Sequence, residues 1–77
     1  MIIDLTQLKA NQKGVIVELA GGEEFNRRIQ NIGIRAGKTV RKINAQFWRG
    51  PQTVEVNGMK VAVGHGMAKK IMIKVSQ

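Results

Sequence analysis

The sequence contains no cysteine, one histidine, one serine and only five acidic residues among its 77 residues. Without cysteine, neither a disulfide framework nor a thiolate metal site can form, and a cytoplasmic setting is the simplest interpretation. The few remaining candidates form no cluster with metal-ligand spacing, no Ser/His/Asp set and no pair of carboxylates. The sequence therefore predicts a protein that is not an enzyme and has no catalytic residue, cofactor or metal site within one chain. The sequence leaves open the possibility that two chains together bind a transition metal ion.

Long apolar runs and aromatic residues are also scarce. No stretch approaches the about 18 apolar residues of a membrane-spanning helix, and the N-terminus lacks a basic segment followed by an apolar one. We therefore expect a soluble chain with no direct membrane insertion. The aromatic residues are Phe25, Phe47 and Trp48 alone.

The chain is short and strongly basic. A chain of 77 residues buries about 60% of its unfolded surface, which predicts a single domain over residues 1–77 with no room for a deep catalytic cleft. The net charge is +8, and residues 25–77 carry eleven lysines and arginines against Glu55 alone. Such a field attracts polyanions, acidic protein surfaces or anionic lipids without choosing among them.

One helix is predicted, just after residues 21 and 22. Phe25, Ile29 and Ile32 recur at i, i+4 and i+7, which places three apolar side chains on one stripe. Acidic residues in the first turn complement the positive end of the helix dipole. Gly33 follows the last apolar position, where we expect φ > 0, and Ile34 is expected to pack back on Ile29.

The rest of the chain predicts short strands separated by tight turns. The predicted strands are residues 14–20, 39–47, 53–57, 59–63 and 71–75. Residues 1–12 form a lead-in segment, in which a β-bridge and a single helical turn capped by Thr6 are expected, with Leu5 and Leu8 closing one end of the core. A short turn or one helical turn is expected at 64–69.

The positions of apolar residues predict which face of a strand is buried, and glycines predict where the chain turns. The alternation of Val15, Val17 and Leu19 with the residues between them predicts a strand buried mainly on one face. A bulge is expected near residues 41–42, because the apolar positions 40 and 43 have opposite parity. Gly37 suits the third position of a type II turn, and Asn57-Gly58 predicts a two-residue type I′ hairpin. The predicted fold is a small antiparallel β-barrel with one helix.

Two glycine-containing stretches and the lone histidine are the other candidates for a chemical site. The Gly37-Lys38-Thr39 stretch has the wrong spacing for a phosphate loop and leaves a helix rather than opening one. Residues 64–66 lack the third glycine of a dinucleotide site. His65 is expected to be a solvated loop residue.

Two surface features remain as candidate partner-binding sites. The first is the basic helix and the turn after it, with Arg41 and Lys42 continuing the basic run in the sequence. The second is the aromatic loop around Trp48, which with an adjacent arginine is typical of a contact patch. The predicted partner-binding residues are Arg27, Arg28, Arg35, Lys38, Trp48 and Arg49.

The combined pattern resembles the ferrous iron transport protein A family, FeoA, over nearly the whole chain. That family combines an N-terminal Leu-x-x-Leu, a Gly-x-Ile/Val strand, a helix with Arg-Ile/Leu-x-x-Ile/Leu-Gly-Ile/Leu-x-x-Gly, a hairpin and a final Ala-x-x-Ile-x-Val. The matching residues are Leu5 and Leu8; Gly14, Val15 and Ile16; Arg28, Ile29, Ile32, Gly33, Ile34 and Gly37; Asn57 and Gly58; Ala68, Ile71 and Ile73. The chain departs from the family in the loop at residues 47–51 and in the turn at 64–67.

The resemblance implies an SH3-like β-barrel with a helix inserted after the first strand. It also implies a cytoplasmic accessory protein of bacterial ferrous iron uptake that contacts the cytoplasmic region of the membrane GTPase iron transporter, FeoB. A similar domain serves as an interaction module in iron- and manganese-dependent repressors. Two alternatives stay open, a basic small barrel that binds nucleic acid and a direct iron carrier. The first usually requires several aromatic side chains for base stacking, and the second is short of donor groups. The sequence also leaves open a weak homo-oligomer.

Overall fold

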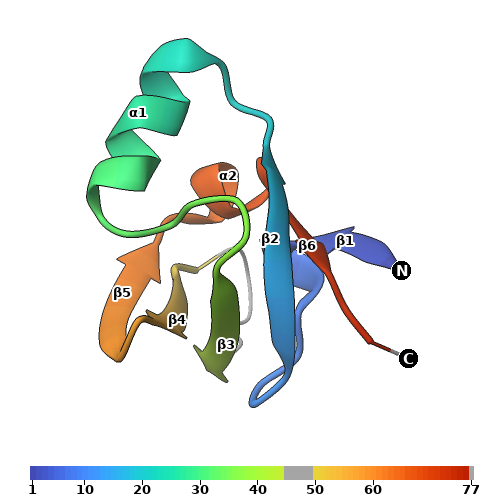
Figure 1. The fold of residues 1–77 in the computed structure, drawn as a ribbon. Helices are drawn as coiled ribbons and strands as arrows, with labels where there is room; N and C mark the ends of the chain where they lie inside the picture. The colour runs from blue at the N-terminus through green and yellow to red at the C-terminus, as the bar shows by residue number, and fades with distance from the viewer. Residues whose placement is uncertain (45–49, 77) are drawn as a thin grey trace.

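A computed structural model describes residues 1–44 and 50–76 of the chain (Figure 1). Six strands form one antiparallel sheet in the order β1-β6-β2-β3-β4-β5. The elements are β1 (Ile2–Asp4), the 3-10 turn η1 (Leu5–Gln7), β2 (Lys13–Leu19), α1 (Glu23–Asn31), β3 (Thr39–Asn44), β4 (Gln52–Val56), β5 (Met59–Val63), α2 (His65–Ala68) and β6 (Ile71–Lys74). The predicted class, mainly β with one helix of more than a single turn after the first long strand, is confirmed.

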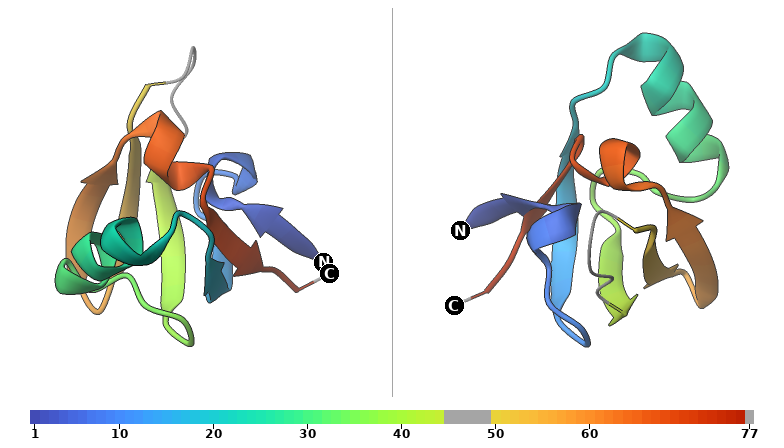
Figure 2. Two further views of the ribbon diagram at one scale, coloured as in Figure 1. Left: turned by 90° about the horizontal axis from the view of Figure 1, so that it is seen from above. Right: turned by 180° about the vertical axis from the view of Figure 1, so that it is seen from behind.

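The sheet curves around one core, and its two end strands lie far apart. β1 pairs with β6 and β5 pairs with β4, and within residues 1–44 and 50–76 the two end strands do not pair with each other. Figures 1 and 2 show β1 and β5 on opposite sides of the molecule, with α1 crossing one end of the sheet. In the described part of the chain, the small SH3-like fold therefore keeps two free sheet edges, β1 and β5.

The core is aliphatic and draws on nearly every element. Its buried members are Leu5, Leu8, Ile16, Ile29, Ile34, Val40, Val54, Val56, Val63, Ala68, Ile71, Ile73 and Val75. Leu5 and Leu8 are each 1% exposed, which confirms that the lead-in segment contributes to the core. In β4 and β6 the buried residues recur at every second position, as in strands with one face towards the core.

α1 ends in the glycine motif that the sequence predicts. Gly33 has φ 98°, and its N–H donates to the carbonyl of Gln30 at 3.0 Å. The N–H of Ile34 donates to the carbonyl of Ile29 at 3.3 Å, and both isoleucines are buried. These two bonds satisfy carbonyls that the helix end would otherwise leave free, and the chain turns back onto the core.

The predicted apolar stripe of α1 is only partly correct. Ile29 is fully buried and Phe25 packs half-buried against the core, whereas Ile32 is 38% exposed. The helix ends at Asn31, and Ile32 is its C-cap with φ −98° and ψ 10°. The third apolar position therefore lies where the chain leaves the helix, so its side chain does not follow the helical stripe.

Both predicted glycine turns are present. The N–H of Lys38 donates to the carbonyl of Arg35 at 3.1 Å, and Gly37 between them has φ 94°, as a type II turn requires. Asn57 and Gly58 have φ of 54° and 77°, which matches the type I′ turn expected between β4 and β5.

In β2 the buried face differs from the one that its valines suggest. Val15 and Val17 are 40% and 38% exposed, whereas Ile16 is fully buried and pairs with Ile73 of β6. Gly14, on the same face as Ile16, approaches β6 so closely that an added Cβ would overlap the side chain of Ile73. The register shift between Ile16 and Glu18 then interrupts the alternation. Its position depends on the pairing with β6, so the sequence of β2 alone does not reveal it.

The 3-10 turn and β3 each differ locally from the predicted structure. The cap of the 3-10 turn is Asp4 rather than Thr6, because the Thr6 N–H donates to Asp4 Oδ1 at 2.8 Å and the Asp4 N–H donates to Gln7 Oε1 at 3.0 Å. The irregularity in β3 falls between Lys42 and Asn44, just beyond the predicted position.

Candidate partner-binding surface

Arg27 and Arg28 lie on the outer side of α1. Successive helical residues are about 100° apart, so both side chains avoid the direction of Ile29, which faces the core. Both are exposed. Arg28 lies in the last turn of the helix, where positive charge interacts favourably with the negative end of the helix dipole.

Arg35 and Lys38 lie on the turn that follows α1. The Arg35 Nε donates to the carbonyl of Gln30 at 3.3 Å, which holds this side chain against the end of the helix. The turn is fixed to β2, because Gly37 N–H donates to the carbonyl of Ile16 at 2.7 Å and Ile16 N–H donates to the carbonyl of Lys38 at 2.9 Å. The structure thus places Arg28 and Arg35 at the same end of α1, with Arg27 on its outer side and Lys38 beside β2.

In the described part of the chain, these four cations make no ion pair with an acidic group. The ion pair in that part joins Arg41 to Glu55. All four are exposed. We call Arg27, Arg28, Arg35 and Lys38 the basic helix surface. Trp48 and Arg49, the other predicted partner-binding residues, lie outside the described residues.

Two exposed apolar side chains beside this surface were not predicted. Ile32 is 38% exposed and Met59 is 53% exposed. The Met59 Cε lies 3.9 Å from where a Cβ on Gly33 would stand, so Met59 reaches the end of α1 next to Ile32. The helical pattern predicts that Ile32 faces inwards, and the alternation of Met59, Val61 and Val63 predicts the same for Met59. A signal was present for Ile32, because it directly precedes the glycine that ends the helix.

On β3, Arg41 and Lys42 follow each other but face opposite sides of the sheet. Arg41 Nη2 and Nε donate to Glu55 Oε1 on β4 at 2.8 and 3.2 Å, and Arg41 Nη1 donates to Asn11 Oδ1 at 3.3 Å. These groups lie on the outer face. The Arg41 and Glu55 side chains are 34% and 33% exposed.

Lys42 is fully buried, so its expected place in the exposed basic run is wrong. Its Nζ donates to the carbonyl of Leu8 at 2.7 Å and to Gln52 Oε1 at 2.6 Å. Gln52 Nε2 in turn donates to the carbonyl of Gly50 at 3.2 Å. Burial lowers the pKa of the Lys42 amine from its usual 10.5, and the carboxylate of Asp4 partly opposes this effect. Lys42 therefore joins the lead-in segment to β3 and β4.

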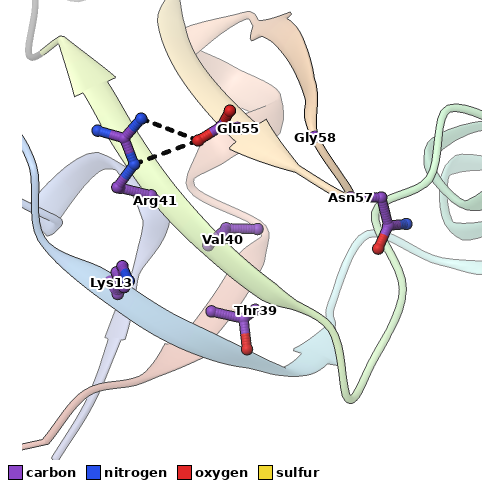
Figure 3. Close-up of a pocket in the computed structure, with 7 residues that line it drawn as sticks. All are labelled: Lys13, Thr39, Val40, Arg41, Glu55, Asn57 and Gly58. Carbon is purple, nitrogen blue, oxygen red and sulfur yellow. Dashed lines mark hydrogen bonds and ion pairs between the residues drawn. The ribbon is translucent and has the colours of Figure 1, made fainter.

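A hollow of about 300 Å³ opens on the outer face where β2, β3 and β4 meet (Figure 3). Its lining residues are Lys13, Thr39, Val40, Arg41, Glu55, Asn57 and Gly58. Figure 3 shows that the guanidinium of Arg41 and the carboxylate of Glu55 pair with each other across neighbouring strands. The single carboxylate in the hollow is therefore already engaged by a cation.

His65 is not the solvated loop residue that the sequence suggests. It is the first residue of α2 and is half-buried, and its Nδ1 is buried without a hydrogen-bond partner among residues 1–44 and 50–76. Within the same residues, no three His, Cys, Asp or Glu side chains gather closely enough to hold a metal ion. A helix both long and apolar enough to span a membrane is likewise not found in this described part.

Comparison with known proteins gives consistent results. A family model for the FeoA domain matches residues 3–75. A curated protein of Methanocaldococcus jannaschii, provisionally named Fe(2+) transport protein A, is 27% identical over 66 residues, which cover 86% of this chain and 78% of that protein.

Solved structures show the same fold. The crystal structure of an iron uptake regulatory protein (FeoA) superposes with a TM-score of 0.87 at 26% identity and covers 96% of both chains. The FeoA protein of Chlorobium tepidum gives a TM-score of 0.85 at 21% identity, over 97% of this chain and 71% of that one. A manganese-dependent transcriptional repressor gives a TM-score of 0.87 at 17% identity, but the match spans only 42% of the repressor. This chain therefore belongs to the FeoA domain family, and its membership implies a role in ferrous iron transport.

Proposed function

We propose that this protein is a cytoplasmic accessory protein of ferrous iron uptake that acts by contacting the cytoplasmic region of the membrane GTPase transporter FeoB. The basic helix surface is the contact site in this proposal. Four exposed cations without an acidic partner in the described chain are the observation that carries it, because such groups are free to pair with an acidic surface. Trp48 and Arg49 remain part of the proposed contact as a prediction.

The position of these cations supports a protein partner. Arg28 lies in the last turn of α1 and Arg35 donates to the carbonyl of Gln30, so both are at this end of the helix. Met59 also reaches this helix end, next to the exposed Ile32. An apolar centre with an arginine rim is the usual composition of protein–protein contact sites. Phe25 is the only aromatic residue among those described, and it is half-buried with the Lys70 Nζ 5.3 Å from its ring centre. A platform for stacking nucleic-acid bases is therefore not favoured within the described residues.

The test is the affinity of the full-length protein for the purified cytoplasmic region of FeoB from the same genome, measured by calorimetry. Replacing Arg28→Glu and Arg35→Glu together is expected to weaken binding by about tenfold or more, because each change replaces an attraction with a repulsion. Lys74→Glu reverses one exposed charge on β6, away from this surface, and as the control should leave the affinity nearly unchanged.

Equal affinity of the double variant and the Lys74→Glu control would overturn the basic helix surface as the contact site. Capture from detergent-solubilised cells, with and without nuclease, separates the competing class. Material that is retained only without nuclease and is released by moderate salt would indicate binding to a phosphate backbone instead.

A further inference from the structure

Among the described residues, 1–44 and 50–76, no strand lies on the outer side of β5, and this edge strand is long enough to pair with another chain. It comprises the five residues Met59–Val63 and pairs with β4 on one side only. Figures 1 and 2 show it at the outer limit of the sheet. The opposite edge, β1, has only three residues.

The hairpin turn determines which backbone groups of β5 are free. A two-residue turn makes its flanking residues, Val56 and Met59, a hydrogen-bonded pair, and such pairs alternate along an antiparallel ladder. Val61 and Val63 are therefore the next residues bonded to β4. The N–H and C=O groups of Lys60 and Ala62 consequently point away from β4. Both residues are exposed, and these groups make no hydrogen bond to any other described segment.

Few of the features that usually protect an edge strand are present in β5. It contains no proline, and its register with β4 is continuous, without a bulge. Natural edges are commonly shortened, bulged, interrupted by proline or charged. Lys60 is the single charged residue of this strand. It discourages pairing between two copies of this chain, each of which has a net charge of +8.

The two faces of β5 differ in chemistry. On one face, Met59 is 53% exposed and extends towards the end of α1, where Ile32 is also exposed. On the other face, Lys60 lies opposite Glu55, whose carboxylate is already bound by Arg41 at 2.8 Å. A strand added to this edge would meet apolar groups with every second side chain and a cation with the others.

We propose that the β5 edge, residues Met59–Val63, is a docking site for an extended partner segment in which apolar and acidic residues alternate. The segment pairs with the free backbone groups of Lys60 and Ala62, its apolar side chains lie beside Met59 and Ile32, and its acidic side chains lie beside Lys60. This proposal deepens the proposed function, on which it rests only for the identity of the partner.

The first test uses a defined probe, the acetylated and amidated peptide Glu-Val-Glu-Val-Glu-Val, titrated into ¹⁵N-labelled full-length protein. The largest amide shifts are expected at Lys60 and Ala62, and hydrogen exchange of these two amides should slow on binding. The corresponding Lys-Val peptide is expected to bind about tenfold more weakly at low salt, because it places like charges together. No perturbation of β5 by the Glu-Val peptide, or equal binding of both peptides, would overturn the proposal.

The matched variants are Ala62→Pro and Ala62→Val. Proline removes the outward N–H of Ala62 without removing a bond to β4, whereas valine keeps this donor and suits a strand. Peptide binding is expected to weaken about tenfold in Ala62→Pro and to persist in Ala62→Val. Equal binding by the two variants would overturn edge pairing. If Ala62→Pro does not fold, Lys60→Gln decides the matter, because it should abolish the preference for the acidic peptide.

The FeoB cytoplasmic region then separates this inference from the proposed function. Loss of binding in Ala62→Pro but not in Ala62→Val supports both. Retained binding in Ala62→Pro together with loss in the Arg28→Glu and Arg35→Glu variant keeps the proposed function and overturns this docking mode. If the unmodified protein does not bind the region, the proposed function fails, and the peptide titration alone decides the role of the β5 edge.

Discussion

The chain contains two pairs of adjacent basic residues in regular elements, and the structure treats them differently. Arg27 and Arg28 on α1 are both exposed and make no ion pair within the described residues. On β3, Arg41 lies on the outer face and binds Glu55, while its neighbour Lys42 is fully buried. The two pairs look alike in the sequence, yet only the first gives two exposed cations.

The difference follows from the geometry of the two elements. Neighbouring residues on a helix are about 100° apart and can both lie on its wide polar side. Neighbouring residues on a strand point to opposite faces, so one of the pair must face the core of a half-buried sheet. A buried ammonium group is tolerated here because the carbonyl of Leu8 and Gln52 Oε1 accept its hydrogen bonds. Whether adjacent basic residues are both exposed can therefore be predicted only when the secondary structure that contains them is known.

The largest expected effect comes from removing the buried member of the strand pair. Lys42→Ala should lower the free energy of unfolding by about 2 to 4 kcal/mol, because it leaves a cavity and removes the donor for two buried acceptors. Urea denaturation of the full-length protein measures this change. A loss below about 0.5 kcal/mol would mean that Lys42 behaves like an exposed residue and would remove the contrast with α1.

A smaller effect is expected from pH, and Lys42→Met isolates it. The folded pKa of Lys42 lies below 10.5, so between that pKa and 10.5 the unfolded chain binds more protons than the folded one. The free energy of unfolding should therefore rise with pH across this window in the unmodified protein, relative to Lys42→Met. Well below the folded pKa, the difference between the two proteins should be constant.

The measurement is the unfolding free energy of both proteins from neutral pH up to 10.5. The other lysines are common to both, so their titration largely cancels in the comparison. A difference that falls as pH rises would contradict a lowered pKa and would indicate that the attraction of Asp4 outweighs burial.

The smallest expected effect belongs to the outer member of the strand pair. Arg41→Ala should cost about 0.2 to 1 kcal/mol and less at high salt, because the ion pair with Glu55 is partly exposed to solvent. Denaturation midpoints at low and high salt measure it. A loss of more than about 2 kcal/mol in the free energy of unfolding would mean that Arg41, like Lys42, is important for the stability of the fold.

Local patterns in the sequence predicted much of the fold. Gly33 and Gly37 have the positive φ expected of them, and Asn57-Gly58 forms the expected hairpin turn. Each of these follows from the steric freedom of a few neighbouring residues. The buried face of β2 was not predictable in this way, because it depends on pairing with β6. The burial of Lys42 was not predictable either, because it depends on contacts with the lead-in segment.

One part of the candidate site was also predictable from local sequence patterns, and the other part was not. The exposure of Arg27 and Arg28 was predicted from the sequence, because a helix with one apolar stripe places its arginines outside. Arg35 and Lys38 lie on the glycine turn that the sequence also predicts. The apolar part was not predicted. Ile32 and Met59 belong to segments 27 residues apart in the sequence, and both continue patterns that point inwards. Only the end of α1 at Asn31 and the position of β5 at the sheet edge leave them exposed.

By itself, the sequence determined where the chain turns, which segments are strands or helix, and that the later part of the protein is strongly basic. These properties depend on backbone sterics, on residue periodicity and on charge, all of which act over a few residues or simply add. Tertiary structure decided which face of β2 is buried, which lysine enters the core and which strand is left as a free edge. Those outcomes depend on strand order and register, which are contacts between residues distant in the sequence.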